Sequence, residues 1–346
     1  METTLKEDIK FNCDVSDAKY WGFFSICGLL LRYRDLYRSE NNLKSWTNIR
    51  REDIAAWIDQ KETRWPELEQ KEFRDLTVNG KAFDPFDAAG INRALGPQGL
   101  VYGAGYGMYM KPTFFLAELR STKEVSGLVV HTSGTEYVRD LFTASAMLQG
   151  NTVFLRREPL SILLQYKFSE MNAKGHTVIE DAFSHYGFPH RQLMDTTLEQ
   201  RLEGLADRYS GIVLCHEIAE FKEALPLWND ILAAAGDRMN EHYLRAVKDL
   251  IADTSDHGPL KRIVETRDRG ALSLSVALLE GFQRALFPEL RDAYAEFLRN
   301  KDWDAIEKAR EAGYARFVSE RERIVRIYQS SAKEDFIQEL KKVLPA

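Results

Sequence analysis

A helical spacing of apolar residues runs through almost all of the second half of the chain and limits what that half can fold into. From Pro159 onward, apolar side chains recur about every 3.6 residues, as they do along one face of an α-helix. Glycine and proline interrupt this pattern at a few places, which mark the expected helix ends, at residues 175, 187–189, 236, 258–259 and 288. We therefore predict a helical domain over residues 159–346.

The first part of the chain, residues 1–158, has a different pattern. Cap residues at 14–17 precede an apolar periodicity over residues 20–37, and a second helix is expected to begin near Glu52. Glycine, proline and asparagine are frequent over residues 71–107, which predicts loops around a short helix at residues 86–95. These features predict a helical N-terminal segment.

Three short runs further along predict strands rather than helices. Residues 113–120, 126–133 and 152–156 are rich in β-branched or aromatic side chains and are bounded by turn residues. We expect them to form a small, mostly antiparallel sheet, with a helix over residues 137–148 on one face. The predicted fold class is α+β and predominantly helical, with a small central antiparallel sheet and a helical C-terminal half.

Composition excludes several classes of protein. Three scattered cysteines in 346 residues are too few for a disulfide framework and favour a reducing compartment. The net charge of −6 attracts no nucleic acid, and the most apolar stretch, residues 20–31, is too short to span a bilayer. We expect a cytoplasmic protein with a small-molecule or peptide substrate and with neither a nucleic acid nor a membrane as partner.

The segment HEIAE at residues 216–220 is the main candidate for chemistry. His216 and Glu220 are four residues apart, which is about one helical turn, so both side chains can reach one metal ion while Glu217 projects beside them. This is the geometry of H-E-x-x-H zinc motifs, in which the middle glutamate deprotonates a metal-bound water.

With its apolar lead-in and its small Ala219, this segment resembles the active-site helix of the gluzincin zinc metallopeptidases. The resemblance implies a third ligand on the following helix, and Glu241 lies 25 residues after His216. It also implies that Glu217 is the general base, and that His242 is a substitute ligand or a transition-state donor. Glu220 stands where the family has histidine, and two carboxylate ligands favour iron or manganese over zinc. We therefore expect a metal-dependent hydrolase with a divalent metal, zinc or iron or manganese, bound by His216, Glu220 and Glu241.

Two other interpretations remain open. Five of the seven histidines fall within 67 residues, and with nearby glutamates they could build a two-metal carboxylate redox centre in a helical bundle, although the usual Glu-x-x-His signature is absent. Alternatively, the histidines are structural, and the protein is a non-catalytic helical module that binds a ligand or partner. The residues that could join His216 and His242 in a two-metal site are His176, Glu180, His185 and His190.

The N-terminal segment carries a second resemblance. Residues 11–40 resemble the opening of an uncharacterised bacterial family of unknown function. That resemblance implies no activity.

Overall fold

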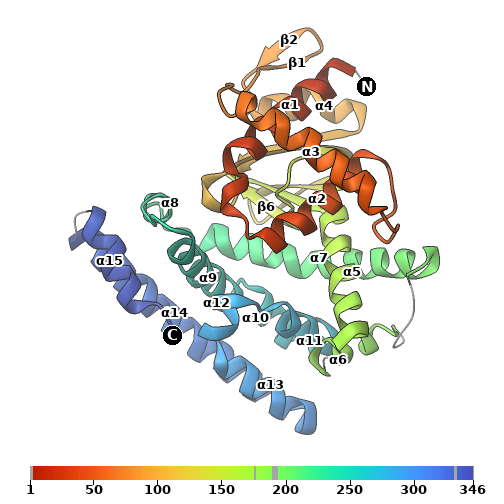
Figure 1. Cartoon of the computed structure of the whole chain (residues 1–346). Helices are drawn as coiled ribbons and strands as arrows, with labels where there is room; N and C mark the ends of the chain where they lie inside the picture. The colour runs from red at the N-terminus through yellow and green to blue at the C-terminus, as the bar shows by residue number, and fades with distance from the viewer. Residues whose placement is uncertain (1–2, 175–176, 189–193, 331–332, 346) are drawn as a thin grey trace. The chain divides into compact units, whose positions relative to one another are not determined.

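The computed structural model describes residues 3–174, 177–188, 194–330 and 333–345 (Figure 1). The chain divides into two compact units, residues 1–162 and residues 163–346. Unit 1 contains α1 (Thr3–Tyr20), η1 (Trp21–Phe23), α2 (Ile26–Glu40), α3 (Arg51–Leu68), β1 (Leu76–Val78), β2 (Lys81–Phe83), α4 (Ala88–Leu95), η2 (Gly96–Gln98), β3 (Leu100–Tyr106), η3 (Met108–Met110), β4 (Pro112–Val125), β5 (Leu128–Arg139), β6 (Ala146–Gln149) and β7 (Thr152–Arg156).

Helix α5 (Arg157–Lys174) begins in unit 1 and continues into unit 2. The remaining elements of unit 2 are helices: α6 (Thr177–His185), α7 (Thr196–Lys222), α8 (Trp228–Ala233), α9 (Arg238–Thr254), α10 (Pro259–Thr266), α11 (Arg269–Leu278), α12 (Gly281–Leu286), α13 (Pro288–Asn300), α14 (Trp303–Ser330) and α15 (Lys333–Val343). The prediction of an α+β protein with a helical C-terminal half is confirmed. In the part of the chain described, no helix is both long and apolar enough to cross a membrane.

The central sheet differs from the predicted small antiparallel sheet. It has five strands in the order β3-β4-β5-β7-β6, and β5 pairs with β7 in parallel. After β5 the chain passes to the outer edge, where β6 runs antiparallel to β7, so two reversals bring β7 back in the direction of β5. The sheet is therefore mixed, because β7 is inserted between β5 and β6. A separate hairpin pairs β1 with β2.

The predicted helix over residues 137–148 is wrong. Residues 137–139 complete β5, where Val138 and Arg139 pair with Leu116 and Phe115 of β4, and residues 146–149 form β6. Pairing with neighbouring strands overrides the local helical periodicity here.

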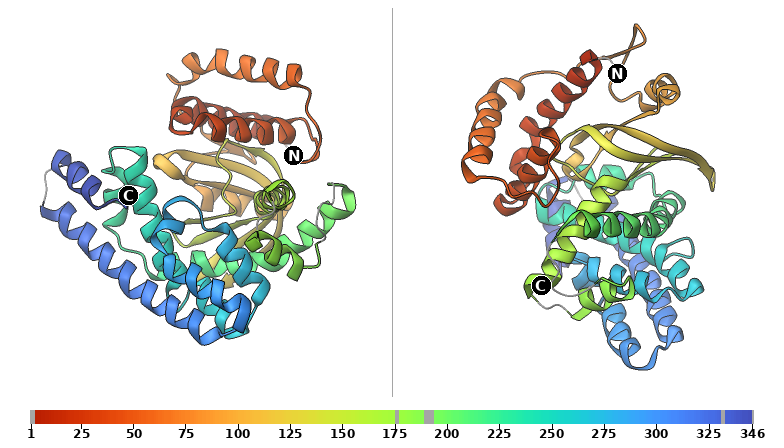
Figure 2. Two further views of the ribbon diagram at one scale, coloured as in Figure 1. Left: turned by 60° about the horizontal axis from the view of Figure 1, so that its bottom comes forward. Right: turned by 90° about the vertical axis from the view of Figure 1, so that its right-hand side faces the viewer.

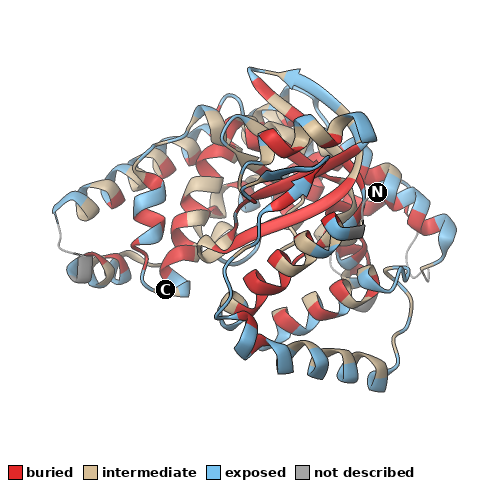
Figure 3. Ribbon diagram, turned by 90° about the horizontal axis from the view of Figure 1, so that it is seen from above, coloured by how far each residue is buried: buried red, intermediate tan, exposed pale blue. Residues whose placement is uncertain are grey.

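Alternation along the strands gives the sheet two apolar faces. Tyr102 and Phe114 lie in one buried cluster together with residues of α1 and α4, whereas Val101 and Phe115 lie in another with β6 and β7. Helix α1 packs on the sheet, and α3 packs in turn on α1 and α2 (Figure 2). The first half of β4 and nearly all of β7 are consequently buried (Figure 3).

A bidentate ion pair lies within this buried region of unit 1. Arg156 of β7 donates to Glu136 of β5 through Nε (2.6 Å) and Nη2 (2.9 Å), and both side chains are almost completely buried. Bidentate arginine–carboxylate pairs fix geometry as well as charge. The pair therefore links the two strands whose parallel pairing the sequence did not indicate.

Candidate functional site

Helices α7 and α9 of unit 2 carry the candidate site, and they lie side by side (Figure 1). Both begin with an aspartate cap, since Asp195 accepts a hydrogen bond from the Leu198 amide and Asp237 accepts one from the Asn240 amide. His216 of α7 lies beside Asp253 of α9, and Glu220, one turn further along α7, lies beside Lys248, which precedes Asp253, so the two helices run antiparallel.

His216 of α7 contacts a carboxylate with each ring nitrogen. Its Nδ1 lies 2.8 Å from Asp253 Oδ1 on α9, and its Nε2 lies 3.3 Å from Glu220 Oε1 one turn along α7. The predicted convergence of His216 and Glu220 on one helical face is therefore present. Burial alone would lower the pKa of His216, but Asp253 and Glu220 outweigh it and raise that pKa well above its ordinary value.

A lysine completes the arrangement. Lys248 Nζ of α9 lies 2.7 Å from the same Glu220 Oε1 that faces His216. Burial would raise the pKa of Glu220, but Lys248 and His216 hold it well below its usual range. Glu220 is thus ionised and shared between two cationic partners.

Three of these side chains could hold a metal ion. His216, Glu220 and Asp249 each offer one ligand atom, and these atoms all lie within 4.8 Å of one another. Asp249 also accepts a hydrogen bond of 3.0 Å from Gln283. We refer to His216, Glu217, Glu220, Lys248, Asp249 and Asp253 as the α7–α9 cluster. Within the residues that the structure describes, no other group of three histidine, cysteine or carboxylate ligands meets this distance criterion.

Two carboxyl groups of the α7–α9 cluster hold their protons more tightly than usual. Burial, followed by the charge of Glu220, raises the pKa of Glu217 to about 8. Burial also raises the pKa of Asp249 to about 6, against the opposing effect of Lys248. Groups with pKa values near neutrality suit proton transfer at physiological pH.

The other predicted site residues lie away from the three ligand atoms. Glu241 precedes Asp249 by eight residues on α9, which is about 12 Å of helix rise, and its Oε1 accepts a hydrogen bond of 2.7 Å from Arg245 Nε. His242 is half-buried on the same first turn of α9, and burial lowers its pKa. The structure thus brings His216 and Glu220 together with Asp249, and places Glu241 and His242 nearer the start of α9.

The remaining histidines give no second set of ligands in the described chain. His185, at the end of α6, lies 3.8 Å from Asp181, which also accepts hydrogen bonds from Ser273 and Tyr294. Glu180 lies on the same helix. His176 and His190 lie outside the described residues.

The sequence analysis did not identify three members of the α7–α9 cluster: Lys248, Asp249 and Asp253. The spacing of Asp249 and Asp253, four residues apart on a helix with a clear aspartate cap, is the same signal that singled out His216 and Glu220. That spacing places two carboxylates on one face, but it does not say which helix this face meets.

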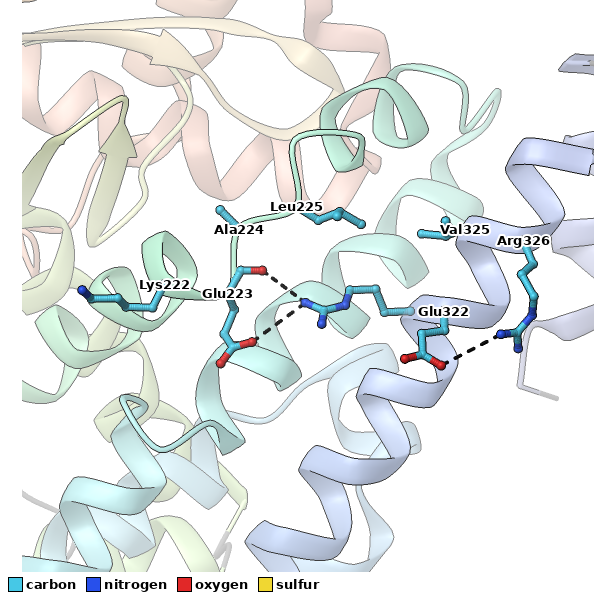
Figure 4. A pocket seen from close by; sticks show the side chains of 8 residues that line it. Lys222, Glu223, Ala224, Leu225, Glu322, Val325 and Arg326 are labelled. Atoms are coloured by element: carbon cyan, nitrogen blue, oxygen red, sulfur yellow. Dashed lines mark hydrogen bonds and ion pairs between the residues drawn. The ribbon is translucent and has the colours of Figure 1, made fainter.

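A surface groove of about 500 Å³ lies beyond the end of α7 (Figure 4). Arg321 of α14 crosses it and donates to the Glu223 carbonyl at 3.1 Å, while Tyr314 donates to the Glu223 carboxylate. Of the described residues that line this groove, none belongs to the α7–α9 cluster: Lys222, Glu223, Ala224, Leu225, Arg321, Glu322, Val325 and Arg326.

Comparison with known proteins identifies the family. The model of the N-terminal domain of a family of unknown function, DUF6866, matches residues 4–156, and the model of its C-terminal domain matches residues 162–344. The chain belongs to this family. No curated protein and no solved structure matches the chain. The DUF6866 family carries no described activity, and no comparison supports a relationship to the gluzincins.

Proposed function

We propose that the α7–α9 cluster binds a divalent metal ion through His216, Glu220 and Asp249, and that the protein is a metal-dependent hydrolase. The observation that carries the proposal is the convergence of these three ligand atoms within 4.8 Å of one another. One imidazole and two carboxylates form a donor set that suits zinc, iron or manganese. The proposal rests on this geometry and on no relationship to a known peptidase family.

Asp253 supports the assignment of His216 as a ligand. A metal-binding histidine commonly donates its other ring N–H to a carboxylate, which fixes the tautomer and the orientation of the ring. The 2.8 Å contact of His216 Nδ1 with Asp253 leaves Nε2 as the ligand nitrogen on the side of Glu220.

Glu217 is the proposed general base. It is buried next to His216 on α7, and its charge interacts with Glu220, His216 and Lys248. A bound cation would stabilise its ionised form, which is the form that accepts a proton from a metal-activated water. Its role is therefore to remove the proton from the water that attacks the substrate.

The Lys248 ammonium group must move away from Glu220 when a metal ion binds. In the described structure this ammonium group is the cation beside Glu220 Oε1, and a divalent ion would take over that role. The Lys248 side chain is one-third exposed, so it can turn towards solvent without unfolding α9.

A second candidate function is favoured by the same contacts. Glu220 already has two positively charged partners and His216 is bonded on both nitrogens, so the α7–α9 cluster is electrostatically satisfied without an ion. On this alternative the protein is a non-catalytic helical module whose histidines are structural.

Elemental analysis of the untagged chain after incubation with zinc, iron(II) or manganese distinguishes the metal-dependent hydrolase from the non-catalytic module. We expect near-stoichiometric metal in the native chain and its loss in His216→Ala and in Asp249→Asn. The matched control is Glu241→Gln, which changes the ligand implied by the sequence and should keep the metal. If the native chain takes up none of the three metals, the non-catalytic alternative replaces the hydrolase.

A further inference from the structure

A lysine of unit 1 lies buried between two aspartates. Lys111 stands between η3 and β4, and its side chain is 2% exposed. Its Nζ lies 3.1 Å from Asp17 Oδ1 of α1 and 3.2 Å from Oδ2 of Asp140, which directly follows β5. Neither carboxylate is more than 4% exposed. An amine is therefore held in contact with two carboxyl groups in a part of unit 1 that solvent barely reaches.

The backbone that presents Lys111 is fixed in an unusual conformation. Tyr109 and Met110 have φ values of 61° and 53°, which are unfavourable for residues with a Cβ. Such strain persists only where the surrounding contacts over-determine it, and here the amide and the carbonyl of Lys111 close the turn through hydrogen bonds of 3.1 and 2.8 Å. Its Nζ also donates to Ser16 Oγ at 2.8 Å. The amine is thus held against Asp17.

The two aspartates have different surroundings. Both carboxylate oxygens of Asp17 face one backbone amide, that of Leu141, at 3.1 and 3.2 Å. Burial raises the pKa of Asp17 to about 6 against the opposing charge of Lys111, so its neutral carboxyl form is accessible near neutral pH. Asp140 instead accepts a separate backbone amide on each oxygen, at 3.0 and 2.7 Å, and these bonds fix its direction towards Nζ.

Lys111 starts as an ammonium group in this site. Burial alone would lower the pKa of Lys111, but Asp140 and Asp17 outweigh it and raise that pKa. Desolvated charges are costly, and transfer of one proton from Nζ to Asp17 converts the ion pair into a neutral amine beside a neutral carboxyl group. A neutral amine is a nucleophile and a neutral carboxyl group is an electrophile, and contact distance with fixed orientation favours their reaction.

We propose that Lys111 and Asp17 of the folded chain join in an isopeptide bond. After the first proton transfer, the Nζ lone pair attacks Asp17 Cγ, and the Leu141 amide stabilises the charge that develops on the carbonyl oxygen. Asp140 takes a second proton from Nζ and passes it to the leaving oxygen. The Cγ–O bond then breaks and one water molecule departs. The product is an amide that ties α1 to the residue before β4, and the reaction needs no oxidant or other reactant.

A second lysine–aspartate pair in unit 1 provides a comparison. Lys61 Nζ lies 2.9 Å from Asp14 Oδ1, which is closer than the contact proposed to react, but both side chains keep more than a tenth of their surface exposed. Lys61 also lies 3.0 Å from Glu40, and its carboxylate partners outweigh burial and raise the pKa of Lys61. The Lys61 amine therefore stays protonated, and we expect no bond at this pair.

The mass of the denatured native chain tests the proposal. After incubation of the folded chain at neutral pH, we expect a mass below that of the sequence by one water molecule. Trypsin should then release residues 11–19 joined to residues 94–120, because these fragments contain Asp17 and Lys111. The proposal is overturned if the native chain keeps its full sequence mass. It is also overturned if the water is lost without these two fragments being joined.

Three variants assign the roles in the reaction. Lys111→Met should keep its full mass, whereas the matched control Lys61→Met should still lose one water molecule. Asp140→Asn should also keep its full mass, because its amide accepts no proton from Nζ. Joined fragments in Asp140→Asn would remove Asp140 from the reaction. The fragments of the native chain decide whether the bond exists even where a variant does not fold.

Discussion

The Nδ1 atom of His216 lies 2.8 Å from Asp253 Oδ1, across the interface between α7 and α9. This contact fixes which ring nitrogen faces Glu220, and it links the α7 motif to the helix that supplies Asp249. A histidine that appears in the sequence as half of a short motif is therefore part of a two-helix site.

Asp253→Asn should weaken metal binding without abolishing it. The asparagine side chain can still form a hydrogen bond with His216. It carries no negative charge, however, and so cannot stabilise the partial positive charge that a bound ion induces on the imidazole. Loss of such an orienting carboxylate commonly weakens metal affinity by about 10–100-fold. Competitive titration against a metallochromic dye measures the change, and an unaltered affinity would remove Asp253 from the site.

Glu217→Gln should abolish hydrolysis and leave the metal bound. The glutamine fills the same space but accepts no proton, and loss of a general base typically slows turnover by about 10²–10⁴-fold. Turnover of a fluorogenic peptide panel by the metal-loaded chain, together with elemental analysis of the variant, measures both properties. Full activity in the variant would mean that another group is the base.

Lys248→Met should tighten metal binding. Methionine keeps most of the apolar stem and removes the ammonium group that lies 2.7 Å from Glu220. We expect an affinity gain of about tenfold, or ~1.4 kcal/mol, from the loss of this competing cation. Lys222→Met on α7 is the control and should bind metal as the native chain does. Equal affinities in native chain and Lys248→Met would show that Lys248 does not compete with the ion.

The metal-free chain should lose stability as the pH rises from about 5 to 8. Burial raises the pKa of Glu217 from its ordinary 4.5 to about 8, so between these values the folded state binds more protons than the unfolded state. The free energy of unfolding then falls with rising pH, by up to ~1.4 kcal/mol per pH unit from this one group. Urea unfolding in the presence of a chelator should show this slope, and Glu217→Gln should flatten it. A slope that persists unchanged in the variant would assign it to other groups.

Glu136→Gln should strongly destabilise unit 1. The substitution leaves the buried guanidinium of Arg156 without its carboxylate, a loss that typically amounts to about 3–5 kcal/mol. The control is Glu118→Gln, which removes an exposed partner of Arg120 and should change stability by less than about 1 kcal/mol. Denaturant unfolding of both variants gives the comparison, and similar values would show that the buried pair contributes no more than a surface pair.

Local chemistry was sufficient to predict several parts of this protein. The helical spacing after residue 159 acts within single helices, so the helical structure of the C-terminal half could be predicted directly. His216 and Glu220 are one turn apart on α7, and their contact needs no other element. Strands β4, β5 and β7 could be predicted because their residues are rich in β-branched or aromatic side chains and are bounded by turn residues.

Only the tertiary structure decided the features that join distant segments. The parallel pairing of β5 with β7 depends on β6 taking the outer edge, and β5 extends to Arg139 because β4 lies beside it. In the same way, Lys248, Asp249 and Asp253 belong to the site because α9 runs antiparallel to α7 at one particular register. A sequence period places side chains on a face of its own element, but packing between elements decides which face each one meets.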